Sequence, residues 1–201
     1  MAKRVFDIVC SLVGLILLSP LFLVVAALIK FDSPGPVFYR GMRVGQNARP
    51  FRIVKFRTMV PESAGRGPAI TASSDPRVTR IGRLLRRTKV DELPQLINVL
   101  TGAMSLVGPR PEDPAFVAHY SAQQRQLLSI RPGITSPGSL SYRDEEAMLK
   151  QDTWEKTYRE EVLPRKLAIE LDYFARQSLA RDVGIILQTL WALLPTHRKP
   201  A

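Results

Sequence analysis

The sequence predicts a mostly helical α/β fold with an N-terminal membrane anchor, and three observations lead to this class. Residues 8–29 carry no charge and are long enough to cross a bilayer as one helix. Residues 37–40 and 51–57 are rich in aromatic and β-branched side chains, which predicts one small β-hairpin. Most of the remaining chain repeats apolar residues at helical spacing. We therefore expect an anchor over residues 1–31 and a second domain over residues 32–201.

The predicted anchor is interrupted by Ser19-Pro20 at its middle. Proline removes one helical hydrogen bond and clashes with the preceding turn, so a kink is expected there. Two shapes remain open: a kinked spanning helix, and a re-entrant helix hairpin broken at Ser19-Pro20. Each half is about 14–16 Å long at 1.5 Å per residue, roughly the depth of one leaflet. Cations flank the segment on both sides, and the positive-inside tendency then favours the hairpin; these cations are Lys3, Arg4, Lys30, Arg40 and Arg43.

A formal net charge of +11 predicts an acidic partner, such as nucleic acid, anionic lipid or a phosphorylated substrate. The arginines follow neither a reading-helix nor an aromatic stacking pattern, which argues against nucleic acid. The single Cys10 excludes a disulfide framework and a cysteine-based zinc site. His119 and His197 fit no metal-ligand spacing, so both are interpreted as ordinary surface residues.

Several elements follow the hairpin in order. We expect a loop over residues 60–76 and helices over 116–130, from Asp144 onward, over 153–174 and over 179–194. Ser178 is the predicted N-cap of the last helix, whose apolar stripe and Trp191 suit either the membrane interface or a packed core. Residues 78–87 form a basic amphipathic helix, which fits either an anionic membrane surface or a charged protein surface. We therefore include amphipathic interfacial helices in the expected fold.

The reaction centre is predicted at Asp91-Glu92. Leu93, Leu96, Ile97 and Leu100 recur at helical spacing, and Pro94 is tolerated only in a first turn, so the two acids should lie at a helix start. Acidic residues are common there for structural reasons alone. Cations nevertheless surround this pair on both sides; they are Arg86, Arg87, Lys89 and Arg110. A carboxylate that holds Mg²⁺ and arginines that bind phosphate oxygens would suit a phosphorylated substrate.

Lys55 is a further candidate, because it shares a strand face with Phe51 and Ile53. Its ammonium group should then lie at the edge of a core or pocket, although a solvated lysine fits the same pattern.

Motifs along nearly the whole chain resemble one family, the bacterial sugar transferases, or monotopic polyprenyl-phosphate phosphoglycosyl transferases. The motifs that carry the resemblance are Arg4-Val5-Phe6-Asp7, Ser19-Pro20, Gly35-Pro36-Val37-Phe38, Lys55-Phe56-Arg57-Thr58-Met59, Leu85-Arg86-Arg87-Thr88, Asp91-Glu92-Leu93-Pro94-Gln95, Asn98-Val99-Leu100, Met104-Ser105-Leu106-Val107-Gly108-Pro109-Arg110-Pro111, Arg131-Pro132-Gly133-Ile134-Thr135 and Leu171-Asp172-Tyr173.

The resemblance implies an enzyme whose catalytic domain, residues 32–201, lies on the cytoplasmic face of the bacterial inner membrane. It would transfer a sugar 1-phosphate from a UDP-sugar to undecaprenyl phosphate and release UMP, as the first membrane step of polysaccharide or glycoconjugate synthesis. Asp91 would be the nucleophile and Glu92 would hold Mg²⁺. The expected phosphate and substrate contacts are Lys55, Arg57, Arg86, Arg110, Pro109, Pro111 and Asp172.

One stretch departs from the family pattern. Many members continue after Arg131-Pro132-Gly133-Ile134-Thr135 with a motif ending Ala-Gln-Val-Asn-Gly-Arg, whereas this chain continues Ser136-Pro137-Gly138-Ser139. The identity of the sugar therefore stays open, as does the oligomeric state, a homodimer included. We expect a small member that consists of the catalytic core alone. The rival hypothesis is a basic membrane-bound scaffold without catalysis, which accounts for the charge and the anchor but not for the acids among arginines.

Overall fold

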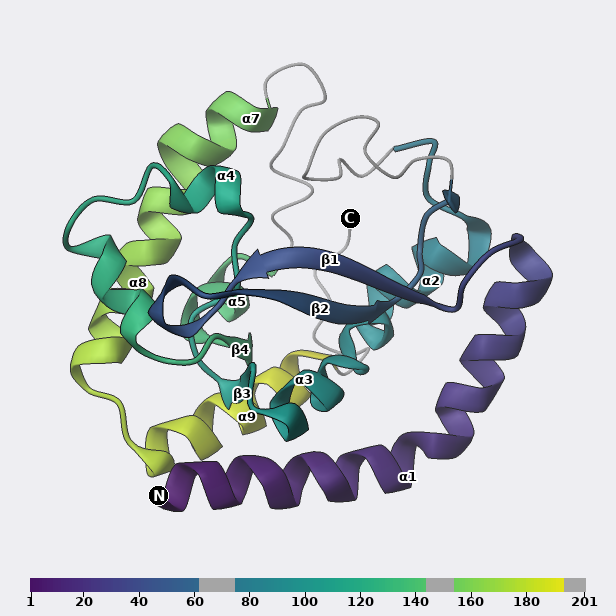
Figure 1. Ribbon diagram of the computed structural model, residues 1–201, viewed down its shortest axis with the longest axis horizontal. Coiled ribbons are helices and arrows are strands. Elements are labelled where there is room, and N and C mark those ends of the chain that lie inside the picture. The colour runs from purple at the N-terminus through teal and green to yellow at the C-terminus, as the bar shows by residue number, and fades with distance from the viewer. Residues whose placement is uncertain (62–74, 144–153, 194–201) are drawn as a thin grey trace.

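The computed structural model describes residues 1–61, 75–143 and 154–193. Most of the predicted 60–76 loop and the predicted helix start at Asp144 lie outside this range. The described fold is mostly helical around a β-hairpin that crosses the middle of the molecule (Figure 1). Helix α1 borders one edge, and α7 and α8 lie at the other end of the hairpin from α2. The main helices and strands are α1 Ala2–Asp32, β1 Phe38–Val44, β2 Pro50–Phe56, α2 Arg80–Thr88, α3 Gln95–Thr101, β3 Ser105–Val107, α4 Pro114–Val117, β4 Gly133–Thr135, α5 Pro137–Ser141, α7 Trp154–Thr157, α8 Leu163–Ala175 and α9 Leu179–Leu193.

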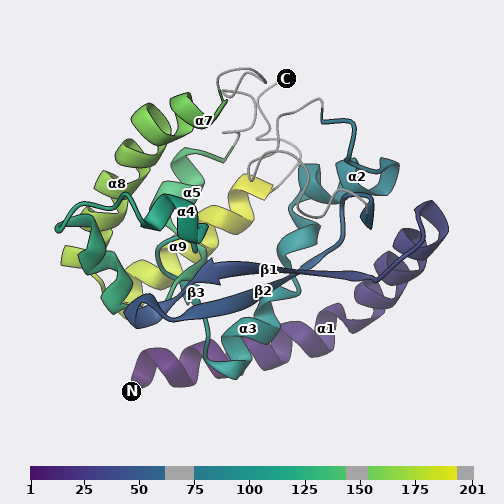
Figure 2. The same ribbon diagram turned by 45° about the horizontal axis from the view of Figure 1, so that its top comes forward.

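Helix α1 is one continuous helix that bends near its middle, where Pro20 lies inside it (Figures 1 and 2). Proline has no N–H for the carbonyl of Ile16, four residues earlier. The Ser19 hydroxyl donates to that carbonyl oxygen at 2.8 Å and replaces the missing hydrogen bond. The kink predicted at Ser19-Pro20 is confirmed. The chain stays helical through the bend, however, so the two halves are not separate antiparallel helices.

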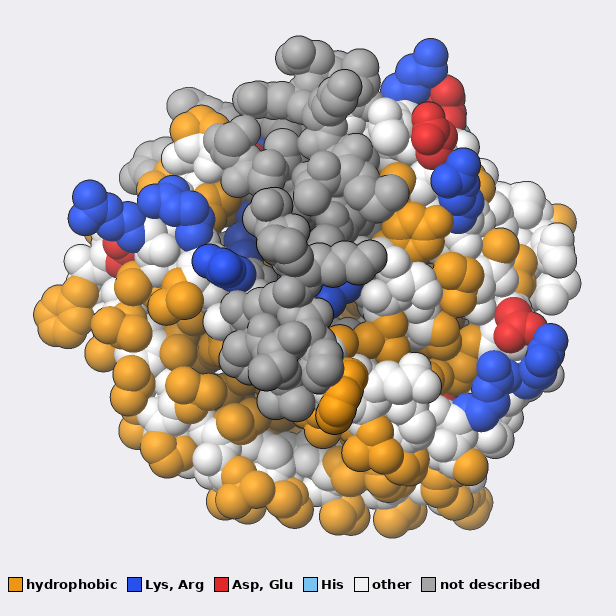
Figure 3. All heavy atoms as spheres, turned by 180° about the vertical axis from the view of Figure 1, so that it is seen from behind, with side chains coloured by type: hydrophobic (Ala, Val, Ile, Leu, Met, Phe, Trp, Pro, Cys, Tyr) orange, Lys and Arg blue, Asp and Glu red, His pale blue; other side chains and the backbone are white. Residues whose placement is uncertain are grey.

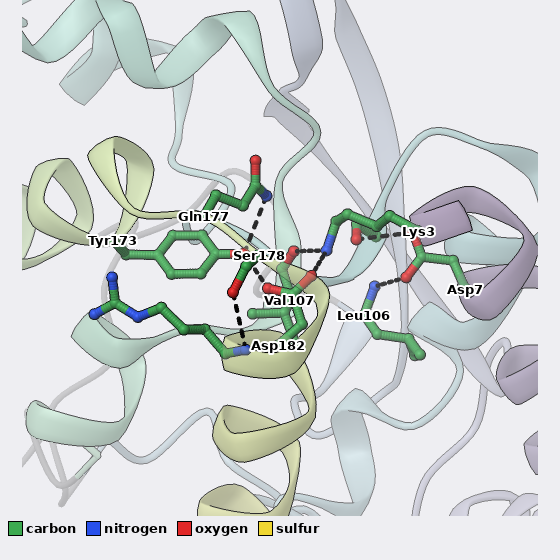
Figure 4. A network of polar contacts seen from close by, with 10 residues as sticks. Lys3, Asp7, Leu106, Val107, Tyr173, Gln177, Ser178 and Asp182 are labelled. Atoms are coloured by element: carbon green, nitrogen blue, oxygen red, sulfur yellow. Dashed lines mark hydrogen bonds and ion pairs between the residues drawn. The ribbon is translucent and has the colours of Figure 1, made fainter. Parts of the chain in front are cut away.

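Buried polar contacts fix the first turns of α1 to the rest of the protein. The Arg4 guanidinium donates to the carbonyls of Val99 and Leu100, at 2.6 and 2.9 Å, and so caps the end of α3. Asp7 accepts from the backbone N–H of Leu106 at 3.1 Å, and Lys3 pairs with Asp182 of α9 (Figure 4). Three charged side chains of α1 therefore reach α3, β3 and α9, which are far apart in the sequence.

The second half of α1 packs through Val25 and Ile29 against Phe56 and Leu85. Other faces of α1 are uncovered: Leu17, before Pro20, and Leu23, after it, are 73% and 74% exposed. Within the described residues, α1 is the helix that is long and apolar enough to cross a membrane. Figure 3 shows hydrophobic side chains along the lower edge of the molecule, where α1 runs. An uncovered apolar surface along a helix of this length is typical of a face that contacts lipid or another protein.

The predicted hairpin is confirmed and is longer than expected. Strands β1 and β2 pair antiparallel, with Phe38 opposite Phe56 and Tyr39 opposite Lys55. Asn47, at the turn, adopts a left-handed conformation with φ 55°, which asparagine tolerates well. The second sheet is a parallel pair, β3 with β4, in which Ser105 lies opposite Gly133.

The helix predicted over residues 116–130 is wrong as one element. The structure has a short α4 and a separate 3-10 helix, Gln124–Ser129. Ser121 and Gln124 exchange hydrogen bonds in the manner of a capping box, which starts a new turn between the two helices. The break lets apolar side chains of both pieces reach one core; they are Phe116, Val117, Tyr120 and Leu127.

The C-terminal helices match the prediction closely. A helical run from Trp154 to Ala175 contains a π-helical segment, Tyr158–Val162, between α7 and α8. Helix α9 begins after Ser178, whose hydroxyl accepts from the N–H of Arg181 at 3.3 Å, as expected of an N-cap. The buried face of α9 contains Ile185, whereas Leu187 and Trp191 are exposed.

Candidate active site

Asp91 and Glu92 lie in a tight connection between two helices. Helix α2 ends at Thr88, Lys89 takes the left-handed conformation with φ 58°, and Val90–Glu92 form one 3-10 turn before α3. The sequence predicts the two acids in the first turn of α3. In the structure they instead precede α3, in a separate 3-10 turn. The reversal at Lys89 turns this pair toward the hairpin, since β2 contacts the turn.

The buried face of α3 also differs from the predicted stripe. Leu96 and Val99 are buried, but Ile97 is exposed, and Gln95 and Asn98 take buried positions. Asn98 explains this arrangement. Its side chain accepts from the N–H of Val54 at 2.8 Å and donates to the carbonyl of Arg52 at 2.9 Å. A polar side chain that satisfies two backbone groups of β2 takes the place of an apolar contact.

Glu92 is held by cations from two other elements. Lys55 of β2 contacts Glu92 Oε1 at 2.6 Å, and Arg110, beyond β3, contacts the same oxygen at 3.4 Å. Burial alone would raise the pKa of Glu92, but the charges of Lys55, Arg110 and Lys89 outweigh burial and hold it well below its ordinary value. Glu92 is therefore ionised at neutral pH. Lys55 lies at the edge of this site, as its strand position predicts.

Asp91 differs from its neighbour. Its side chain is 7% exposed, and Oδ1 is buried without a hydrogen-bond partner among the described residues. Burial, and then the charge of Glu92, raise the pKa of Asp91 to about 6, against the opposing charges of Lys55, Lys89 and Arg86. An ionised carboxylate with a free oxygen and a raised pKa is more basic than an ordinary aspartate, which suits a nucleophile.

The two carboxylates fit Mg²⁺ with the help of a substrate. In the described part of the chain, no group of three or more His, Cys, Asp and Glu side chains forms a metal cage. Mg²⁺ in phosphoryl-transfer sites is typically bound by one or two carboxylates together with substrate phosphates. The buried oxygen of Asp91, without a partner in residues 1–61, 75–143 and 154–193, and the ionised Glu92 beside it match that type of site.

Three further predicted residues lie on α2 or beside Arg110 in the chain. Arg86, in the last turn of α2, is close enough to act on the pKa of Asp91. Pro109 and Pro111 are buried on either side of Arg110. The Pro109 carbonyl accepts from the N–H of Gly133 at 2.9 Å, which fixes this loop on β4.

Two predicted residues have other surroundings. The Arg57 guanidinium is buried and donates to the carbonyls of Ser33 (2.8 Å) and Pro34, so it fixes the chain just after α1. Asp172 lies exposed on α8 in ion pairs with Arg176 at 2.7 Å and Arg181 at 3.6 Å. The structure does not bring either side chain to Asp91, and their roles toward the substrate stay predictions.

Two residues were missed as functional candidates. Asn98 belongs to one of the motifs that carry the resemblance and is a polar residue on a helix face that is otherwise apolar, and both signals were available in the sequence. Glu112 follows Pro109-Arg110-Pro111 directly, and its carboxylate turns inward to Tyr158 at 2.9 Å. No spacing rule in the sequence connects Glu112 with the helix around residue 158.

The chain is similar to proteins of one family over almost its whole length. A family model described as bacterial sugar transferase matches residues 1–196. A UDP-glucose:undecaprenyl-phosphate glucose-1-phosphate transferase of Caulobacter vibrioides is 40% identical over 96% of this chain and 70% of its own length. A UDP-N-acetylgalactosamine-undecaprenyl-phosphate N-acetylgalactosaminephosphotransferase of Aeromonas hydrophila is 37% identical, over 96% of this chain and 43% of its length.

The exopolysaccharide production protein PSS of Rhizobium leguminosarum bv. phaseoli is 39% identical, over 94% of this chain and 92% of its own length. The similarity thus covers almost the whole chain, while several relatives are more than twice as long as the matched region. The chain belongs to the bacterial sugar transferase family.

Proposed function

We propose that this protein transfers a sugar 1-phosphate from a UDP-sugar to undecaprenyl phosphate through a covalent intermediate on Asp91, releasing UMP. The observation that carries the proposal is the pair itself. Asp91 is buried with an oxygen that has no hydrogen-bond partner in the residues that the structure describes, next to a Glu92 whose charge is compensated by Lys55 and Arg110. The names of the relatives supply the substrate class, an undecaprenyl-phosphate acceptor and a UDP-sugar donor.

The reaction has two half-reactions at one phosphorus atom. An Asp91 carboxylate oxygen attacks the phosphorus that carries the sugar, the bond from this phosphorus to the bridging oxygen breaks, and UMP leaves with the electron pair. An oxygen of undecaprenyl phosphate then attacks the same phosphorus. The bond to Asp91 breaks, which restores the carboxylate and gives the diphosphate-linked lipid.

Fixed cations lower the barrier of both steps. Lys55, Arg110 and Arg86 lie beside the carboxylates, where they would offset the negative charge of two reacting anions. Mg²⁺, when bound by Glu92 and the diphosphate, would supply Lewis-acid stabilisation of the leaving phosphate. Burial of Asp91 keeps water away from the acyl-phosphate until the lipid phosphate arrives.

The anchor supports a re-entrant placement. Both ends of α1 contact the same domain, Lys3 at α9 and Ile29 at the core beside Phe56. A straight bilayer-spanning helix would separate its ends by about 30 Å of hydrocarbon. A bent helix with both ends on one domain instead enters and leaves a single leaflet, and flanking cations favour the cytoplasmic face of the bacterial inner membrane. The exposed stripe of α9, with Leu187, Leu190 and Trp191, would rest at the same interface.

The test is UMP release by detergent-purified protein given undecaprenyl phosphate, Mg²⁺ and a panel of UDP-sugars. We expect one or a few UDP-sugars to be turned over, with a requirement for lipid, metal, Asp91 and Glu92. Asp91→Asn and Glu92→Gln should be inactive, whereas the Arg43→Gln control, which removes a partly exposed ion pair with Asp113, should keep wild-type activity. Folded wild-type protein that releases no UMP from any UDP-sugar would favour the non-catalytic membrane scaffold.

A further inference from the structure

A buried charged cluster lies behind Arg110, and the proposed reaction does not use it. Lys166 and Glu170 of α8 are each only 3% exposed, and the Glu112 side chain is 11% exposed. Tyr158 and Tyr120 are buried with them. Burying charge is costly, and apolar residues of similar volume often give equal or greater stability. A cluster of this kind therefore calls for a role beyond stability.

Glu112 is fixed at both its backbone and its side chain. Its carbonyl oxygen accepts from the N–H of Val44, at the end of β1, at 3.1 Å. Its Oε1 accepts from the Tyr158 hydroxyl at 2.9 Å and lies 3.8 Å from Lys166 Nζ. The Lys166 ammonium also lies 5.4 Å from the centroid of the Tyr158 ring. The carboxylate is thus held by the π-helical segment and by α8.

Glu112 ends a short rigid segment whose centre is Arg110. Pro109 and Pro111 each have a fixed φ, and both are buried. One end of the segment is held by the hydrogen bond from Gly133 to the Pro109 carbonyl, and the other end by Glu112. The Arg110 side chain extends from this segment toward Glu92 at 3.4 Å. A displacement of Glu112 would therefore move the Arg110 backbone.

We propose that Glu112, held by Tyr158 and Lys166, is a positioning residue that fixes Arg110 for the diphosphate of the UDP-sugar. The inference rests on the proposed function. An arginine binds phosphate oxygens through a planar fork, so its contribution depends on where its backbone starts. We call Glu112 with Tyr158 and Lys166 the clamp. Through Arg110, the clamp links the C-terminal half of the chain to the proposed reaction centre.

Glu170 provides a matched control. It belongs to the same buried cluster, but it accepts hydrogen bonds from Ser136 and the backbone of Gly138, at the start of α5. Among the described residues, none of those around Arg110 donates to it. Glu170→Gln replaces a buried carboxylate with an amide, as Glu112→Gln does. The two variants thus differ in whether the altered residue holds the Arg110 segment.

The test is a double-mutant cycle of Glu112→Gln and Arg110→Ala. With saturating undecaprenyl phosphate, we expect Glu112→Gln to raise KM for the UDP-sugar about tenfold, with kcat and KM for the lipid within about twofold of wild type. In the Arg110→Ala background, Glu112→Gln should have no further effect. Glu170→Gln should leave KM for the UDP-sugar unchanged. The proposal would be overturned if the increases in KM caused by Glu112→Gln and Arg110→Ala multiply in the double variant. An equal increase in KM caused by Glu170→Gln would overturn it as well.

Binding of UDP, measured by titration calorimetry on the same variants, separates this inference from the proposed function. One outcome is that no UDP-sugar is turned over while the effects of Glu112→Gln and Arg110→Ala on the free energy of UDP binding are non-additive. In that case the proposed reaction is wrong and the proposed role of Glu112 is supported. Wild-type protein that does not bind UDP would contradict both. If Glu112→Gln does not fold, Tyr158→Phe removes one donor to the same carboxylate. It should raise KM for the UDP-sugar by about threefold, and an unchanged KM would refute the clamp.

Discussion

Neighbouring carboxylates with opposite pKa shifts are the main feature at the residue scale. Glu92 has Lys55 and Arg110 on one oxygen, and these charges keep it ionised. Asp91 is also buried, but its Oδ1 lacks a hydrogen-bond partner within the described part of the chain, and Glu92 adds a repulsive charge. Environments that separate the pKa values of two adjacent acids often mark different chemical roles. Here the two environments distinguish Glu92, whose charge is compensated by cations, from Asp91, which is more basic.

Asp91→Asn should abolish activity and stabilise the fold. The folded pKa of Asp91, about 6, is above its unfolded value of 3.8, so ionisation costs stability as pH rises from about 4 to about 6. At pH 8 the neutral amide avoids that cost. We expect the free energy of unfolding to rise by about 2 kcal/mol, as measured by urea denaturation. UMP release should fall by roughly a thousandfold or more. A variant that is destabilised and keeps activity within about tenfold would contradict this role.

Lys55→Met should destabilise the protein as well as inactivate it. Loss of one partner leaves Glu92 buried with less compensation, and the expected decrease in the free energy of unfolding is about 3 kcal/mol. Arg43→Gln removes a more exposed ion pair, Arg43–Asp113 at 3.2 Å, and should cost about 1 kcal/mol or less. Chemical denaturation of both variants at pH 7.5 makes the comparison. Equal losses would show that Lys55 does not compensate a buried charge.

At the scale of elements, periodic patterns and end signals in the sequence predicted most of the helices and strands. The β-hairpin, the Ser178 cap of α9 and the kink at Pro20 follow from short-range chemistry. The helix predicted over residues 116–130 was wrong because a local capping box of Ser121 and Gln124 starts a new turn there. The α3 stripe was wrong because a long-range contact decided it. Asn98 turns inward to satisfy the backbone of β2, which lies more than forty positions earlier in the chain.

The packing of α8 on α5 should be sensitive to pH through Glu170. Burial raises the pKa of Glu170 to about 7, and the charge of Glu112 also raises it. Hydrogen bonds from Ser136 and Gly138 and the charge of Lys166 oppose this increase in part. Tyr120 also lies near both carboxylates. The folded state then holds a proton that the unfolded chain releases above about pH 4.5. The protonated Glu170 therefore contributes its full stabilisation below about pH 4.5, and this contribution is lost as the pH rises toward 7.

Glu170→Gln should remove this component of the pH dependence. Between about pH 4.5 and 7, the free energy of unfolding of the wild type should fall by up to about 3 kcal/mol relative to the variant. Urea denaturation of both proteins across this range measures the difference. Parallel curves would mean that Glu170 titrates normally and that its carboxylate is already ionised throughout.

At the scale of the whole molecule, one bent apolar helix contacts the rest of the protein at both of its ends, beside the proposed reaction centre. Arg4 caps α3 and Ile29 packs beside Phe56, so α1 contacts elements on both sides of the Asp91 turn. The sequence predicted the anchor and the pair of acids from charge and spacing. It could not predict that Arg57 turns to Ser33, or that Glu112 reaches Tyr158, since both contacts depend on the tertiary fold.

Cysteine labelling in intact cells tests the placement of α1. In a Cys10→Ala background, Ala2→Cys and Arg49→Cys should both be shielded from a membrane-impermeant thiol reagent and should both react after lysis. The reason is that both ends of α1 contact the same domain. Labelling of Ala2→Cys alone in intact cells would mean that α1 spans the bilayer.

The most direct test of the central claim is to trap the covalent intermediate. Wild-type protein is incubated with its UDP-sugar and Mg²⁺ but no lipid acceptor, quenched in acid and mapped by peptide mass spectrometry. We predict a sugar phosphate on the peptide that carries Asp91, absent from Asp91→Asn and lost when undecaprenyl phosphate is added. An active enzyme that carries no adduct, or carries it on a residue other than Asp91, would contradict the assignment of the nucleophile.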